Sequence, residues 1–172
     1  LSTKVEIIEK ILKDNEQNFK AQIANDNSEG QIVLSGRIDD LDKSIIILKE
    51  NMIKSIKLPV SAPFHCSLMD KATQIMSKEL NELKFTQSKN KLISNVTAKE
   101  ISSTDELKNL LIRQIENRVR WRESVINMIN NDIKYFIEIG PGKVLSGLVK
   151  RINKEVKIST INNQGDIEGL EI

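Results

Sequence analysis

Strand-like and helix-like segments alternate near the end of the chain, and this alternation limits the possible folds more than any other feature. Residues 133–140, IKYFIEIG, are a nearly continuous apolar run ending at Gly-Pro-Gly, which is typical of a buried strand. Residues 143–152 carry apolar side chains at helical spacing, and residues 156–161 have the pattern of another strand. Strand, helix and strand in this order predict an α/β fold with a mostly parallel sheet.

The first 60 residues predict a different arrangement. The helix at the start is expected to begin at a T-x-x-E capping box formed by Thr3 and Glu6. The order helix, strand, strand, helix, strand matches a ferredoxin-like plan that lacks its first strand, so we expect a chain truncated before Leu1. The expected elements are a helix over 3–15, strands over 19–26 and 31–36 joined by a turn, a helix over 39–52 and a strand over 53–60.

The remaining residues are expected to form a second unit. Residues 1–60 are therefore interpreted as an incomplete small subdomain, and residues 61–172 as part of an α/β core. The expected elements before residue 133 are a helix over 67–81, a short strand over 90–98, a helix from Ser103 or Thr104 to about Ile115, and a helix with a stripe of Trp121, Val125, Met128 and Ile129.

Composition excludes several classes of function. Lys and Arg total 26 against 24 acidic residues, and the basic residues are scattered, so we expect no nucleic-acid partner. One cysteine and one histidine cannot build a disulfide framework or a familiar transition-metal cluster. The sequence has neither a recognisable signal peptide nor an apolar run near the ~20 residues that a membrane helix needs. The expected location is the cytoplasm, with no bound metal.

The one histidine lies in LPVSAPFHCSLM, residues 58–69, between an expected strand and an expected helix. Sites in α/β folds gather at the ends of strands and at subdomain boundaries, so His65 is a candidate general base. The alternative is an ordinary histidine without special chemistry. Cys66 is adjacent, but neighbouring side chains in an extended segment point in opposite directions, which favours a small buried apolar role for this thiol.

Two other motifs could carry chemistry. A serine nucleophile on a strand-to-helix turn needs the pattern G-x-S-x-G, and neither Ser35 nor Ser146 has the flanking glycines. Gly140 and Gly142 open a helix and could bind an anion with free backbone N–H groups. A tight strand-to-helix turn uses glycine without any ligand, and this second interpretation is favoured. The residues thus provide a candidate base and no candidate nucleophile.

Several motifs together resemble the bacterial malonyl-CoA:acyl carrier protein transacylase family of acyltransferases. They are NSEGQIVLSG (27–36), LPVSAPFHCSLM (58–69), SNVTA (94–98), LIRQIENRVRW (111–121) and IEIGPGKVLSGLVKRI (137–152). The resemblance implies an α/β-hydrolase-like large subdomain with an inserted ferredoxin-like small subdomain. It also implies transfer of malonyl from CoA to the phosphopantetheine thiol of acyl carrier protein in fatty acid synthesis, without a permanently bound cofactor.

The resemblance also assigns site residues. His65 matches the family's general base, and Gln114 matches the residue whose main-chain carbonyl orients that base. Phe64 resembles the position that discriminates between acyl groups, so malonyl-CoA is preferred over its methyl-branched analogue as the expected substrate. The alternatives are a polar residue at a helix end for Gln114 and packing between subdomains for Phe64.

The chain departs from the family at the nucleophile. The motif G-H-S-L-G, the malonyl-binding Arg and the N-terminal oxyanion segment are not found in the sequence. We therefore expect a C-terminal fragment that is inactive alone and needs a serine from a preceding segment or a separate N-terminal fragment. The alternative function is a non-catalytic remnant or a module that binds acyl carrier protein.

Overall fold

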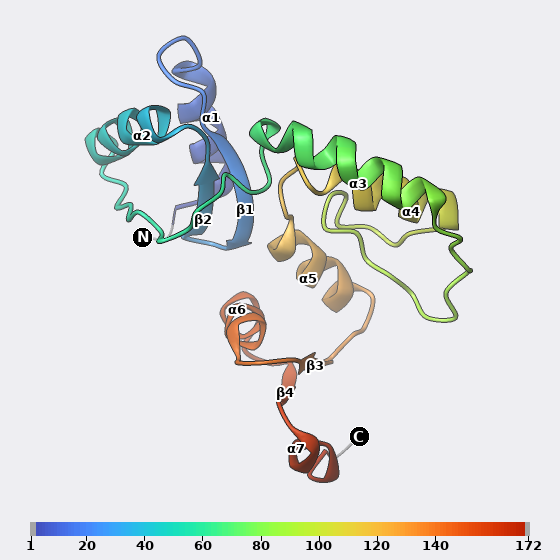
Figure 1. Cartoon of the computed structure of the whole chain (residues 1–172). Helices are drawn as coiled ribbons and strands as arrows, with labels where there is room; N and C mark the ends of the chain where they lie inside the picture. The colour runs from blue at the N-terminus through green and yellow to red at the C-terminus, as the bar shows by residue number, and fades with distance from the viewer. Residues whose placement is uncertain (1–2, 171–172) are drawn as a thin grey trace.

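Helices and strands fall into two groups along the chain in the computed structural model, which describes residues 3–170 (Figure 1). The first group lies before residue 51 and the second begins at residue 67. In chain order the elements are α1 (Val5–Asp14), β1 (Gln22–Ser28), β2 (Gln31–Ser35), α2 (Ile38–Glu50), the 3₁₀ helix η1 (Ser67–Met69), α3 (Asp70–Glu82), α4 (Thr104–Arg113), α5 (Trp121–Asn130), β3 (Tyr135–Ile139), α6 (Val144–Ile152), β4 (Lys157–Ile161) and α7 (Gln164–Glu168).

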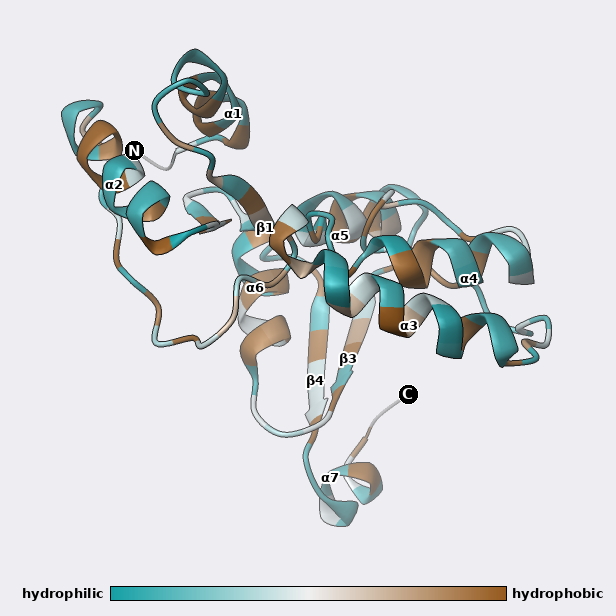
Figure 2. Ribbon diagram, turned by 45° about the horizontal axis from the view of Figure 1, so that its top comes forward, coloured by the Kyte–Doolittle hydropathy of each residue, from teal (hydrophilic) through white to brown (hydrophobic). Residues whose placement is uncertain are grey.

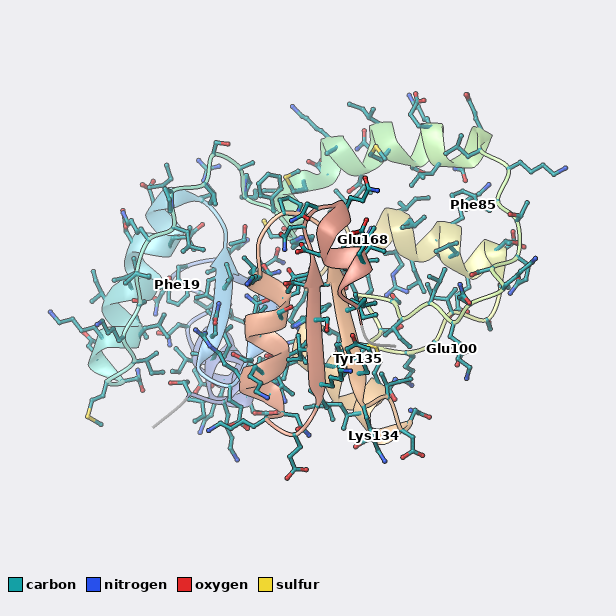
Figure 3. All side chains as sticks on the ribbon, turned by 90° about the horizontal axis from the view of Figure 1, so that it is seen from below. Phe19, Phe85, Glu100, Lys134, Tyr135 and Glu168 are labelled. Carbon is teal, nitrogen blue, oxygen red and sulfur yellow. The ribbon has the colours of Figure 1, made fainter. Side chains whose placement is uncertain are left out.

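The first group is an antiparallel hairpin with two helices beside it (Figure 1). β1 and β2 are joined by a tight turn in which Gly30 has a φ of +75°, a conformation that favours glycine. Ile8, Ile11 and Leu48 form the buried core between the helices, and hairpin side chains such as Ile23 pack against it. Phe19, which is 4% exposed, lies close to the hairpin (Figure 3).

Two expectations for this group are wrong. Residues 53–60 form no strand, although their alternating pattern fits one, and Leu58 and Val60 are 48% and 63% exposed. Periodicity describes the faces of a segment but does not supply the neighbouring strand whose hydrogen bonds it needs. The first helix has Lys4 as its N-cap without a side-chain hydrogen bond, so the capping box of Thr3 and Glu6 does not form. The described residues of this group thus form two helices and a two-stranded hairpin, and the ferredoxin-like plan stays a prediction.

The second group contains the expected parallel strand pair. β3 pairs with β4 in parallel register from Tyr135–Lys157 to Ile139–Ile161, and the connecting helix α6 packs on the sheet. Val125, Val149 and Val156 are the buried centre, and Trp121, Met128 and Ile129 of the predicted stripe pack around them. Bands of hydrophobic and hydrophilic residues along α3 and α4 show their amphipathic character (Figure 2).

Three details of the second group differ from expectation. β3 is not buried, because Ile139 is 78% exposed and Ile137 is 37% exposed. Residues 90–98 form no strand beyond one isolated bridge between Ile93 and Glu100. The short helix α7 was not expected, and it begins with a capping box between Asn163 and Asp166. No helix within residues 3–170 is long and apolar enough to cross a membrane.

Backbone hydrogen bonds join the two groups through β1. The N–H of Asp26 donates to the carbonyl of Val119 at 2.9 Å, and the N–H of Val119 donates to the carbonyl of Ala24 at 2.8 Å. Val119 belongs to an extended segment between α4 and α5, so β1 contacts the second group directly. The division of the chain at residues 60 and 61 stays a prediction.

Candidate active site

His65 lies on the loop that enters η1, and its backbone has an unusual conformation. Its φ is +57°, in the left-handed region that few residues other than glycine occupy. Such a conformation costs energy and persists only where the surrounding structure holds it, often at functional sites. The loop therefore places this imidazole at a cost in backbone energy.

The imidazole contacts the end of α4. Nδ1 of His65 lies 2.8 Å from the main-chain oxygen of Gln114, the C-cap residue of that helix. The last carbonyl groups of a helix have no partner within it, so this oxygen is available as an acceptor. A carbonyl only accepts hydrogen bonds, so the geometry requires the proton on Nδ1. Nε2 then carries the lone pair that can accept a proton.

Gln114 is itself held in place. Its N–H donates to the carbonyl of Leu110 at 3.0 Å, and its side-chain oxygen accepts a hydrogen bond from Nδ2 of Asn95 at 3.4 Å. The carbonyl of Asn95 accepts from the N–H of Arg120 at 2.8 Å. Hydrogen bonds thus link the end of α4, which carries the acceptor for His65, to the segments that contain Asn95 and Arg120.

Cys66 and Phe64 flank His65 in different environments. Cys66 is 1% exposed, and its thiol donates to the carbonyl of Pro63 at 3.2 Å. This agrees with a small buried apolar role rather than a thiol nucleophile. Phe64 is 50% exposed, so its ring is not packed away inside the part of the chain that the structure describes.

The glycine turn after β3 does not offer a free anion site. The carboxylate of Glu138 accepts the N–H groups of Leu145 at 3.0 Å and Ser146 at 2.7 Å, so it occupies the start of α6. Burial opposes the ionised form of Glu138, but hydrogen bonds from Ser146 and Leu145 outweigh it and lower the pKa of this carboxyl. The φ values of Gly140 and Gly142 are +138° and +95°, which accounts for both glycines structurally.

The sequence did not predict an ion pair between Arg122 of α5 and the buried carboxylate of Asp26 in β1. Asp26 in β1 has a side chain that is 1% exposed and accepts two hydrogen bonds from Nε and one from Nη2 of Arg122, at 2.8 to 3.1 Å. The hydrogen bond to Asp26 raises the pKa of Arg122, although desolvation opposes it. The partners are 96 positions apart, so no local pattern pointed to this contact. Within residues 3–170 no group of three His, Cys, Asp or Glu side chains is arranged to hold a metal ion.

Known proteins with similar sequence and fold are malonyl CoA-acyl carrier protein transacylases. A malonyl CoA-acyl carrier protein transacylase of Bacillus subtilis is 38% identical over 157 residues, which are 91% of this chain. The crystal structure of the malonyl CoA-acyl carrier protein transacylase from Clostridium perfringens matches 98% of this chain with a TM-score of 0.92 at 36% identity. Over nearly its whole length, this chain is similar to malonyl CoA-acyl carrier protein transacylases.

The chain spans about half the length of the transacylases it matches. It covers 50% of the Bacillus subtilis protein and 54% of the Clostridium perfringens structure. A further transacylase match, with a TM-score of 0.88 at 30% identity over 95% of this chain and 53% of that chain, is a malonyl-transacylase in complex with its type II PKS acyl-carrier protein. No protein-family model matches the chain. The similarity therefore covers nearly all of this chain and about half of each transacylase.

Proposed function

We propose that this chain supplies the histidine side of an acyltransferase site that moves malonyl from CoA to acyl carrier protein in fatty acid synthesis. The observation that carries the proposal is the 2.8 Å contact between Nδ1 of His65 and the carbonyl of Gln114, in a chain similar to the transacylases. His65 is the proposed general base, and Gln114 is the proposed orienting residue. The contact fixes the tautomer in which Nε2 is free, which a general base needs.

The proposed reaction has two matched halves. A serine hydroxyl attacks the thioester carbonyl of malonyl-CoA while Nε2 of His65 takes its proton, and CoA leaves as a thiol after receiving that proton. The thiol of phosphopantetheine then gives its proton to Nε2 and attacks the malonyl ester, and the serine oxygen recovers the proton. His65 ends each cycle neutral, and no metal or redox cofactor takes part in this proposal.

The serine and the malonyl-binding arginine of this proposal come from residues outside the printed sequence. The sequence lacks the pattern G-x-S-x-G, and it covers about half of its relatives. Exposed apolar side chains in the described part of the chain support a missing neighbour, since such surfaces mark interaction sites when they are contiguous. They include Phe64 at 50%, Leu68 at 44%, Ile139 at 78% and Val144 at 70% exposure.

A transfer assay tests this proposal. The chain alone is expected to move no malonyl from malonyl-CoA to the phosphopantetheine form of acyl carrier protein. The same chain joined to the part of the Bacillus subtilis transacylase that it does not cover is expected to transfer malonyl. Transfer by the chain alone contradicts the proposed division of the site, and a folded but inactive joined protein contradicts the role of His65.

A second candidate is a non-catalytic module that binds acyl carrier protein. It is favoured by the absence of the serine motif and by the matched malonyl-transacylase that is solved in complex with an acyl-carrier protein. Binding of acyl carrier protein by the chain alone, without transfer in the joined protein, would support this candidate. For both candidates we propose a cytoplasmic location.

Phe64 is the proposed specificity residue. In the joined protein, Phe64→Ala is expected to lower the preference for malonyl-CoA over methylmalonyl-CoA by about 10- to 200-fold, because the ring would no longer crowd an added methyl group. Parallel measurements of kcat/KM for both substrates check this ratio. Phe64→Leu keeps an apolar side chain of intermediate size and should retain more of the preference. An unchanged ratio in Phe64→Ala would assign the selection to other residues.

A further inference from the structure

We propose that Gln22, the first residue of β1, is a positioning residue that holds the His65 loop against Gln114. Gln22 lies 43 positions before His65, and none of the motifs that indicate the family contains it. The catalytic role of Gln22 rests on the proposed function. Its contact with the His65 loop is a feature of the described chain.

The side chain of Gln22 takes the place of a missing cap. Its Oε1 accepts a hydrogen bond from the N–H of Ser67, two residues after His65, at 2.7 Å. η1 begins at Ser67, and its N-cap residue Cys66 makes no side-chain cap, while its thiol donates to the carbonyl of Pro63. The first N–H groups of a helix need an acceptor from outside it, and here β1 provides one.

The same strand also holds the segment that follows Gln114. Asp26 and Ala24 of β1 exchange backbone hydrogen bonds with Val119, five residues after Gln114, at 2.9 and 2.8 Å. β1 therefore contacts both chain segments that meet at the bond between His65 and Gln114. β1 then sets the separation between the imidazole of His65 and the carbonyl of Gln114.

The backbone of His65 explains why such a support is needed. Its φ of +57° is unfavourable for a residue with a Cβ atom, so the loop relaxes when a restraint is removed. Loss of the Gln22 acceptor frees the N–H of Ser67 to bond with water. The loop can then return toward ordinary backbone angles, and Nδ1 moves away from the carbonyl of Gln114.

The test uses the full chain labelled with ¹⁵N, whose single histidine gives unambiguous ring signals. Gln22→Ala is expected to speed amide exchange at Ser67 by roughly 2- to 13-fold relative to the original chain. It is also expected to lower the fraction of His65 with the proton on Nδ1. Gln22→Glu keeps an acceptor oxygen and should restore both readouts, and Gln74→Ala, an exposed position on α3, should change neither.

Unchanged Ser67 exchange or an unchanged ring tautomer in Gln22→Ala overturns the inference. Equal effects of Gln22→Glu and Gln22→Ala overturn it as well, because a lost acceptor could not then be the cause. An original chain with the proton on Nε2 instead contradicts the geometry behind the proposed function. The Ser67 exchange rates then still decide whether Gln22 restrains the loop.

Discussion

Replacing His65 by Ala in the joined protein is expected to lower kcat/KM for malonyl transfer by about 10²- to 10⁴-fold, the usual contribution of a general base. The imidazole is the group that would take the proton of the serine and later that of the incoming thiol. Its position against the carbonyl of Gln114 leaves Nε2 as the acceptor. Steady-state kinetics with malonyl-CoA and acyl carrier protein measure the effect.

Gln114→Ala provides the matched comparison. Gln114 contacts His65 through its main chain, and within residues 3–170 its side chain makes only a 3.4 Å hydrogen bond to Asn95. Loss of that bond is expected to cost at most about tenfold in kcat/KM. Equal losses in His65→Ala and Gln114→Ala would contradict orientation through the backbone, and full activity of His65→Ala would contradict the base itself.

Asp26→Ala is expected to lower the free energy of unfolding of the chain by about 3–5 kcal/mol. The substitution leaves the guanidinium of Arg122, whose side chain is 19% exposed, without its carboxylate partner. A buried ion pair need not stabilise a fold relative to apolar residues, but removal of one partner leaves a charge without compensation. Urea unfolding followed by circular dichroism measures the change.

Asp42→Ala is the control for this ion pair. Asp42 pairs with Lys57 at 2.5 Å, but their side chains are 49% and 63% exposed, so its loss should cost about 0–1 kcal/mol. If Asp26→Ala does not fold, the double variant Asp26→Ala with Arg122→Met removes the unpaired charge and should recover part of the stability. A loss no larger than that of Asp42→Ala would contradict the role given to Asp26.

The sequence predicted the elements whose side chains follow a period and have a local partner. The stripe from Trp121 to Ile129 became the buried face of α5, because helical spacing fixes which residues share a face. The strand predicted over residues 53–60 does not form, because a strand depends on a neighbouring strand that periodicity cannot identify. The predicted capping box at Thr3 was wrong, because its sequence permits a cap but the local backbone makes Lys4 the N-cap instead.

The candidate site was predictable only in part. His65 could be selected from its place between elements, but the contact with Gln114 spans 49 positions and was expected only from the family resemblance. Asp26 and Gln22 make contacts over 96 and 45 positions, and neither belongs to a recognisable local motif. Contacts of this kind are set by how distant segments pack, so one sequence alone does not reveal them.

The tautomer of His65 tests most directly whether this residue is an oriented base, because it can be measured on the 172-residue chain alone. The ¹⁵N spectrum of the neutral ring is expected to show the proton on Nδ1 and a bare Nε2, as the 2.8 Å contact with the carbonyl of Gln114 requires. A neutral ring with its proton mainly on Nε2 would place two acceptors against each other at that contact. That result would contradict the account of His65 as an oriented base.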